Sequence, residues 1–222
     1  MSTVDSYYKN TRPEVCVFLP DSYSKVLEIG CAEGEFRHNL DKHCEYWGVE
    51  PSPRAAKTAT KFLHKVLIGT YDEIAEHLPD HYFDLIICND VIEHMVDHNI
   101  FFQQIKTKLH PNGYITGSIP NVRYINNLIE VLLEKDWRYK EQGILDKTHL
   151  RFFTEKSLKR SIEENGFTIE KLEGINNYLK NLFSLDGVYR RIKYFPMIFI
   201  LGQDIKYMQF GIRIRLTKTP NA

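Results

Sequence analysis

The sequence predicts an α/β fold with a doubly wound, mostly parallel seven-stranded sheet. Short apolar segments alternate with helical segments between residues 20 and 120, and residues 83–89 form an apolar run, FDLIICN, typical of a strand buried on both faces. Strands that alternate with helices form a parallel sheet with right-handed crossovers, so helices cover both faces. Ligands of such sheets bind at the carboxyl ends of the strands, and we expect the functional residues there.

The first half of the chain supplies five of the expected strands and four helices. The strands are expected at residues 25–30, 46–50, 65–68, 83–89 and 114–119. The helices are expected between them, at residues 35–42, 53–63, 71–77 and 99–109. Ser52 suits the N-cap of the second helix, and Pro53 suits its first turn because its missing N–H would be unpaired there. The fourth helix is expected to stop at the PNG tripeptide of residues 111–113.

The second half is less regular. Residues 126–135 are expected to form an amphipathic helix, and Thr154 is a suitable cap for a helix over residues 155–165 that Gly166 ends. The last two strands are expected at residues 167–173 and 207–217. A segment rich in aromatic residues separates them, which predicts a helical, aromatic insert before the last strand.

Composition excludes several classes of protein. The 222 residues include 29 Lys and Arg and 29 Asp and Glu, so no overall positive charge is available for general nucleic-acid binding. No apolar run is long enough for a membrane-spanning helix, and no signal peptide is visible at the N-terminus. The four cysteines lack CxxC spacing, which indicates a reduced, cytoplasmic chain.

The first strand leads into a loop of small residues, LEIGCAEG at residues 27–34. Small residues at positions 30, 32 and 34 would let a ligand approach the backbone, with N–H groups exposed to it. Glu28 places a carboxylate beside this loop, and Glu50, at the end of the second strand, could accept hydrogen bonds from both hydroxyls of a ribose. Because the spacing is GxAxG instead of GxGxxG, a nucleoside ligand without a buried pyrophosphate fits better than a dinucleotide.

Four segments in order, LEIGCAEG, YWGVEPS, FDLIICNDVIEHM and LHPNGYITGSIPN, resemble the class I S-adenosylmethionine-dependent methyltransferases. The resemblance covers roughly residues 20–175, with Ala32 where the family usually has glycine. It implies the Rossmann-like methyltransferase fold and S-adenosylmethionine as the cofactor. We expect one domain over residues 1–222, with a cofactor-binding half at 20–120 and an acceptor half at 121–222 that includes a lid or insert at 176–206.

The resemblance assigns the cofactor contacts position by position. It places Glu28 near the methionine amino group and Glu50 on the ribose hydroxyls. The remaining expected contacts are Gly30, Cys31 and Gly34 along the methionine and ribose, Pro51, Thr70 and Tyr71 around the adenine, and Asn89 and Asp90 beside the sulfonium.

His94 ends the segment DVIEH at residues 90–94. If this segment opens a helix, then Asp90, Glu93 and His94 share one face. His94 then has three alternative roles: a structural or positioning residue, which we favour, a general base, or part of a divalent metal site as in some quinone-biosynthesis relatives. We therefore expect no metal.

His149 lies in a segment that resembles the DxTHLRFFT signature of methyltransferases from polysaccharide and O-antigen biosynthesis clusters. Here Asp146 could orient His149, which could take a proton from a sugar hydroxyl. Arg151 could bind an anionic group of the acceptor, and Asn121, Arg123 and Tyr124 are further acceptor-side candidates. The alternative is an internal Asp–Arg or Asp–His clamp that only orders the loop.

The sequence thus favours an O-methyltransferase acting on a sugar hydroxyl of a nucleotide-sugar, a lipid-linked glycan or a surface polysaccharide. One alternative is a small-molecule or quinone-type O-methyltransferase with a divalent metal. The other is a non-catalytic cofactor-binding partner of a glycosyltransferase. As partners we expect a sugar or glycan acceptor, no nucleic acid, a second copy of the chain in a homodimer, and a peripheral contact of residues 189–200 with the inner face of the membrane.

Overall fold

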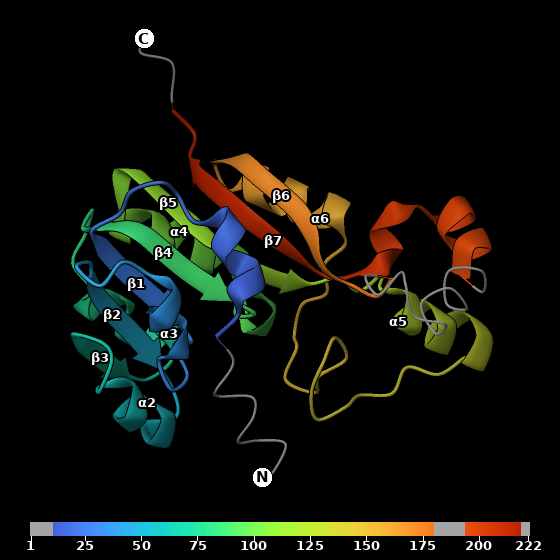
Figure 1. Ribbon diagram of the computed structural model, residues 1–222, viewed down its shortest axis with the longest axis horizontal. Helices are drawn as coiled ribbons and strands as arrows, with labels where there is room; N and C mark the ends of the chain where they lie inside the picture. Colours follow the sequence, from blue (N-terminus) through green and yellow to red (C-terminus); the bar gives the residue numbers. More distant parts are fainter. Residues whose placement is uncertain (1–10, 180–193, 219–222) are drawn as a thin grey trace.

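The computed structural model describes residues 11–179 and 194–218. One sheet in the order β3-β2-β1-β4-β5-β7-β6 crosses the molecule (Figure 1). Strands β1 to β5 run parallel, and β7 pairs antiparallel with both β5 and β6. The strands are β1 (Lys25–Ile29), β2 (Glu45–Glu50), β3 (Lys65–Ile68), β4 (Phe83–Asn89), β5 (Leu109–Pro120), β6 (Phe167–Asn177) and β7 (Tyr207–Leu216). The predicted fold class is confirmed.

Helices connect the strands, and their caps follow the local sequence. The α-helices are α2 (Pro53–Ala59), α3 (Tyr71–Ile74), α4 (His98–Lys108), α5 (Ile125–Ile129) and α6 (Glu155–Glu164), and the shorter helical turns are η1 (Pro13–Phe18), η2 (Glu35–Asn39), η3 (Ala75–His77), η4 (Ile92–His94), η5 (Glu130–Glu134) and η6 (Gln203–Lys206). The side chain of Ser52 accepts a hydrogen bond from the N–H of Ala55, and that of Thr154 accepts one from Ser157.

Several expected helices differ from the structure. The helix expected at residues 53–63 ends at Ala59, and the one expected at residues 35–42 is the 3-10 turn η2. The helix expected at residues 126–135 is α5 followed by one π-helical turn, η5. The helix expected at residues 99–109 ends at Lys108, because Leu109 already pairs with Phe83 in the sheet, and the PNG tripeptide lies within β5. Tertiary pairing therefore extends the strand into residues whose local preference is a turn.

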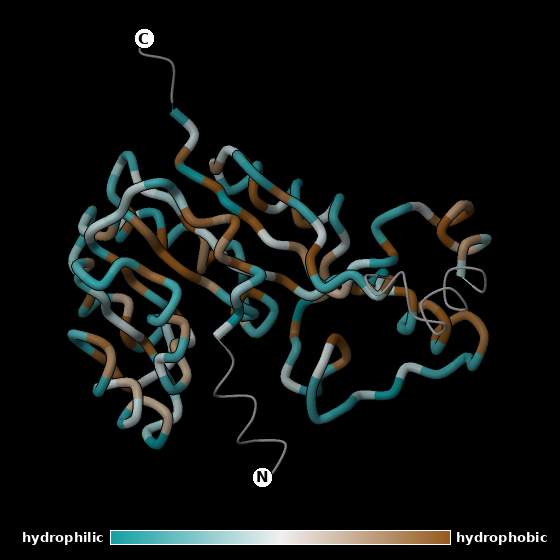
Figure 2. Tube along the Cα trace, viewed as in Figure 1, coloured by the Kyte–Doolittle hydropathy of each residue, from teal (hydrophilic) through white to brown (hydrophobic). Residues whose placement is uncertain are grey.

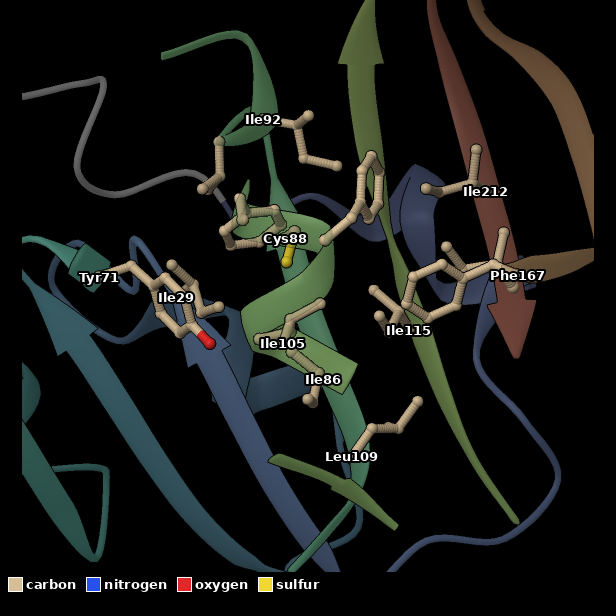
Figure 3. Close-up of a cluster of buried hydrophobic side chains, with 14 of the residues drawn as sticks. Ile29, Tyr71, Ile86, Cys88, Ile92, Ile105, Leu109, Ile115, Phe167 and Ile212 are labelled. Carbon is tan, nitrogen blue, oxygen red and sulfur yellow. The ribbon is translucent and has the colours of Figure 1, made fainter. Parts of the chain in front are cut away.

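Each face of the sheet carries its own hydrophobic core. Residues of β1 alternate between the two, since Leu27 and Ile29 belong to one core and Val26 to the other. The first core is covered by α3, α4 and α6, and Figure 3 shows Ile105 of α4 against Ile86 and Ile115 of the strands. The second is covered by η1, η2 and α2. Burial on both faces leaves the carboxyl edge of the strands as the place where polar side chains can gather.

A small lobe projects beyond the start of β7 (Figure 1). It consists of α5, η5 and a helical stretch at residues 194–201. Its own cluster of buried side chains comprises Ile125, Tyr194, Ile198 and Ile205. The expected insert at residues 176–206 is described only in part, because residues 180–193 lie outside the described ranges. Within those ranges, no helix has the length and apolar character needed to cross a bilayer.

Candidate functional site

A cavity of about 1220 Å³ opens at the carboxyl edge of the sheet. The residues that end β1, β2, β3 and β4 line it, together with Arg12 and Glu14 from the start of the described chain. Most predicted cofactor residues meet here; the ones that line the cavity are Glu28, Gly30, Cys31, Glu50, Pro51, Thr70, Tyr71, Asn89 and Asp90. The cavity therefore combines residues at or directly after the carboxyl ends of four strands, where the predicted strand order places them.

The loop after β1 is held in a left-handed backbone conformation. Gly30, Ala32 and Gly34 have φ angles of 69°, 49° and 85°. A side chain at Gly34 would meet Leu63 of the α2–β3 connection at 2.8 Å, and Gly34 is not among the residues lining the cavity. Its predicted contact with the cofactor is thus replaced by close packing of the loop against the neighbouring elements.

The N–H groups of this loop are not exposed to a ligand as expected. Gly30 and Cys31 donate to the carbonyl of Val49, Ala32 donates to Glu50, and Gly34 donates to the carbonyl of Cys31. These four donors are therefore used within the protein.

The side chain of Glu50 stabilises the loop after β1 through hydrogen bonds. Its Oε2 accepts the N–H of Ala32 at 2.9 Å, and its Oε1 accepts the N–H of Ser52 at 2.9 Å. Burial raises the pKa of Glu50, while these two hydrogen bonds oppose that rise. A carboxylate oxygen can accept more than one hydrogen bond, so each oxygen of Glu50 can also accept a hydrogen bond from a hydroxyl group of a ligand in the cavity.

Glu28 lines the same cavity with a carboxyl group of different character. It accepts a hydrogen bond of 2.5 Å from the hydroxyl of Tyr46, which is fully buried. Burial raises the pKa of Glu28 to about 8, and the hydrogen bond from Tyr46 opposes this only in part. Near neutral pH, Glu28 is therefore largely protonated and can donate a hydrogen bond as well as accept one.

The expected adenine region combines a cap with a buried ring. The N–H and hydroxyl of Thr70 both donate to Glu73, so Thr70 also opens α3. The ring of Tyr71 packs edge-on against Phe101, and its buried hydroxyl has no hydrogen-bond partner among the described residues. A buried hydroxyl without a partner is costly, and Figure 3 shows it among the buried hydrophobic side chains, beside Ile29.

The side-chain amide of Asn89 has two buried polar atoms that make no hydrogen bond to the described residues. Asn89 ends β4 and lines the cavity. A ligand with hydrogen-bonding groups, such as the amino acid or ribose part of S-adenosylmethionine, would satisfy this amide, so the residues present fit that cofactor.

Asp90 is the centre of a network that sequence analysis missed. It has a φ angle of 54°, and its carboxylate accepts hydrogen bonds from Arg12 at 2.6 Å, from Ser118 at 2.8 Å and from Gln209 at 2.7 Å. Arg12 also pairs with Glu14. These partners come from positions up to 119 residues away, so no local pattern could have identified Arg12 or Gln209.

A second cavity of about 380 Å³ adjoins the first. The two share Asp90, His94 and Gln209 along their walls. The second cavity is formed mainly by the loop at residues 141–149, and the side chains that line it are mostly polar. The geometry is that of a larger site joined to a smaller one at the end of β4.

Both predicted histidines face this second cavity, but their partners differ from those expected. His149 Nδ1 lies 2.9 Å from the carbonyl of Ile144, and His94 Nδ1 lies 3.1 Å from the carbonyl of Thr148. A carbonyl only accepts, so in the neutral form of each imidazole Nδ1 carries the proton and Nε2 keeps a lone pair. Burial, with a contribution from His149, lowers the pKa of His94.

Asp146 does not orient His149. Its Oδ1 accepts the N–H and the hydroxyl of Thr148, at 2.8 Å and 2.7 Å. Asp146 therefore closes the turn that holds Thr148. It orders the loop, as the alternative expected, but through Thr148 instead of an arginine or a histidine. The backbone carbonyl of Ile144 orients His149, and such a contact cannot be recognised from the types of residue in the sequence.

Glu93 is the third member of this group. It is 1% exposed, and neither of its carboxyl oxygens has a hydrogen-bond partner among the described residues. Burial and the nearby Asp90 raise the pKa of Glu93 well above its ordinary value. The ligand atoms of Glu93, His94 and His149 lie within 4.8 Å of one another, a set that could hold a divalent metal ion. Asp90, expected in such a site, is held by Arg12 instead.

The predicted acceptor-side residues lie elsewhere. Asn121 donates to the carbonyls of Asp204 and Tyr207, and Arg123 forms an ion pair with Asp204. Tyr124 packs on the small core of the lobe, and the Arg151 guanidinium donates to the carbonyl of Val96. None of these four predicted residues lines either cavity. Each joins segments of the fold, so their polar groups are already used within the protein.

Comparison with known proteins gives consistent results. The chain matches the protein family described as "Methyltransferase domain" over residues 8–172. Among curated proteins, it is 26% identical over 156 residues to the ubiquinone biosynthesis O-methyltransferase of Bradyrhizobium diazoefficiens, covering 68% of this chain and 61% of that protein. It is 27% identical to the mitochondrial ubiquinone biosynthesis O-methyltransferase of Schizosaccharomyces pombe, covering 74% and 63%. The chain thus spans about three fifths of these relatives.

Solved structures share the fold. A methyltransferase from Archaeoglobus fulgidus, described as dependent on S-adenosylmethionine, matches with a TM-score of 0.66 and 23% identity, covering 96% of this chain and 94% of that one. A possible histamine N-methyltransferase from Thermotoga maritima matches with a TM-score of 0.63 and 22% identity, covering 97% and 96%. At these identities the likeness concerns the fold alone.

Proposed function

Because the chain belongs to the methyltransferase domain family, we propose that it transfers a methyl group from S-adenosylmethionine to a hydroxyl oxygen of a small acceptor. The fold and the cofactor predicted from the sequence are those of this family. The reaction, the acceptor and the residues that handle its proton are parts of the proposal.

The observation that carries the proposal is the pair of joined cavities. The larger contains the carboxyl and amide groups suited to a polar nucleoside ligand, and the smaller presents two imidazole nitrogens with free lone pairs. When bound, S-adenosylmethionine supplies an activated methyl group. The protein must then bring the acceptor oxygen into line with this methyl group and keep water away, which is catalysis by proximity and orientation.

His149 is the proposed general base. Its Nδ1 is fixed by the carbonyl of Ile144, so Nε2, which lies 3.9 Å from Oε1 of Glu93, is the nitrogen that takes the proton. Removing the proton of a hydroxyl group raises its nucleophilicity, and a positioned histidine typically contributes about 10²–10⁴-fold to such a step. Asp146 has only the indirect role of shaping the turn.

The smaller cavity has a lining surface that is mostly apolar, and the polar side chains set in it support a sugar hydroxyl as the acceptor. Its side chains include Gln142, Asp146, Lys147 and Thr148, which can exchange hydrogen bonds with several hydroxyl groups. A second candidate is a phenolic hydroxyl of the quinone type. It is supported by the names of the curated relatives and by the cluster of Glu93, His94 and His149, which would hold a divalent metal beside the acceptor.

One experiment distinguishes these candidates. Purified protein is incubated with S-adenosylmethionine and either nucleotide-sugars, free glycans or a catechol, each with and without a chelator, and formation of S-adenosylhomocysteine is measured. Turnover of sugars that resists the chelator supports the first candidate. Turnover of the catechol that is lost with the chelator and restored by magnesium or zinc supports the second. Tight binding of the cofactor with no turnover of any acceptor would favour the non-catalytic partner of a glycosyltransferase.

A further inference from the structure

The helical stretch at residues 194–201 is apolar on its outer side as well as its inner side. Its inner side packs Tyr194 and Ile198 into the small core of the lobe. Its outer side presents Phe195, Phe199 and Ile200, which are 66%, 81% and 77% exposed. A surface helix normally carries polar residues on the side that faces water. Here the sequence from 195 to 202, FPMIFILG, has no polar side chain at all.

A second element of the lobe shows the same feature. Leu132 and Leu133 of η5 are 56% and 70% exposed. Figure 2 shows brown, hydrophobic stretches on both elements of the projecting lobe, which lies away from the main sheet. Scattered exposed apolar side chains are normal, but large ones gathered on one lobe mark a surface that another apolar phase covers.

The charges of the neighbouring sequence indicate which phase this is. Arg190, Arg191 and Lys193 directly precede the helical stretch, and no acidic residue occurs between positions 187 and 203. Basic residues next to an apolar, aromatic helical surface are typical of segments that lie in the interface of an anionic bilayer. Three like charges adjoin this stretch in the sequence, which disfavours a contact between two copies of it.

We propose that this lobe docks on an anionic lipid surface, with the side chains of Phe195, Phe199 and Ile200 inserted between the lipids and Leu132 and Leu133 at the edge of the contact. The inserted side chains supply the apolar contribution, and the adjacent basic residues supply attraction to the lipid head groups. This inference does not depend on which acceptor the protein methylates. It refines the sequence expectation of a membrane contact at residues 189–200, of which 189–193 lie outside the described ranges.

The test is sedimentation of the full chain with vesicles. Vesicles of phosphatidylcholine alone are compared with vesicles that contain one third phosphatidylglycerol, at low and high salt. We expect binding to the anionic vesicles that weakens with salt, since attraction between basic residues and anionic lipids is screened. The double variant Phe199→Glu/Ile200→Glu should reduce this binding at least tenfold. Methyl transfer to a water-soluble acceptor, or binding of the cofactor in solution, should stay unchanged.

Two controls keep the result specific. Ile100→Glu on α4 replaces an apolar side chain that is 55% exposed but lies outside the lobe, and it should bind vesicles like the unchanged protein. Leu133→Glu on η5 tests the lobe without touching the helical stretch, in case the double variant does not fold. The proposal is overturned if the anionic vesicles do not bind the protein, if neither lobe variant weakens binding, or if the lobe variants instead abolish a dimer measured by light scattering.

Discussion

The carboxyl oxygen Oε1 of Glu93 lies 3.9 Å from Nε2 of His149, and both side chains are buried. The two residues meet because the backbone carbonyl of Glu93 accepts hydrogen bonds from the N–H groups of Leu150 and Arg151. These bonds fix the end of the loop at residues 141–149 against the segment that follows β4. The distance is longer than a hydrogen bond, so the lone pair of His149 is not taken up by Glu93. This relationship makes His149 available for a proton from the acceptor.

We expect His149→Ala to lower the rate of methyl transfer about 10²–10⁴-fold, because it removes the proposed proton acceptor. Binding of S-adenosylmethionine, measured by calorimetry, should change little, since His149 does not line the larger cavity. His38→Ala, on η2 and away from both cavities, is the matched control. Undiminished turnover by His149→Ala would remove His149 as the base.

Replacement of Glu50 should weaken binding of the cofactor. In Glu50→Gln, the amide nitrogen must face the N–H of Ala32 or of Ser52, so one hydrogen bond becomes a repulsion between donors. We expect the dissociation constant of S-adenosylmethionine to rise about ten- to a hundredfold, equivalent to about 1.4–2.8 kcal/mol.

The control for this prediction is Glu45→Gln at the opposite end of the same strand. Glu45 accepts hydrogen bonds from Trp47 and Tyr82, so its replacement disturbs the protein to a similar extent far from the cavity. An equal loss of cofactor affinity in both variants would show that the effect of Glu50 is one of general stability.

Glu28 should make the protein less stable as the pH rises. Its pKa is about 8 in the folded protein against an ordinary value of 4.5, so between these values the folded state holds a proton that the unfolded chain has released. The stabilisation is fully present below pH 4.5 and is lost as the pH rises through 8, at no more than about 1.4 kcal/mol per pH unit.

Urea unfolding at pH 5 and at pH 8 measures this effect. The variant Glu28→Gln keeps an acceptor for the hydroxyl of Tyr46 but cannot ionise, so the difference in free energy of unfolding between the two pH values should shrink. Glu76→Gln, on the exposed surface of η3, should leave the difference as it is. A difference that persists undiminished in Glu28→Gln would contradict the raised pKa.

Asn121 should prove structural. Its amide is fully buried and donates to the carbonyls of Asp204 and Tyr207, which join η6 to the end of β5. We expect Asn121→Ala to lower the free energy of unfolding by about 1–3 kcal/mol, because buried carbonyls lose their donor. The KM for the acceptor should not change. If Asn121→Ala raised the KM for the acceptor several-fold with unaltered stability, Asn121 would have the predicted role in acceptor binding. Arg151→Ala is the comparison, and we expect no change in its KM for the acceptor.

Local patterns determined the central sheet and the larger cavity. The apolar run of β4 and the glycine-containing loop after β1 have their conformations set by neighbouring residues, and the carboxyl ends of parallel strands must meet at one edge. Glu28, Glu50 and Asn89 could therefore be placed around one cavity from the order of the strands. The acceptor side lacked such regularity, and four of its expected residues lie outside both cavities.

Only the tertiary structure decided how charges and protons are arranged. The partner of Asp90 is Arg12, and the group that orients His149 is the carbonyl of Ile144, where the signature had suggested Asp146. Both contacts depend on where the chain passes in space, and a backbone carbonyl looks the same at every position of a sequence. A sequence specifies which groups are available, whereas burial and approach between distant segments determine which of them pair, because hydrogen bonds act only over about 3 Å.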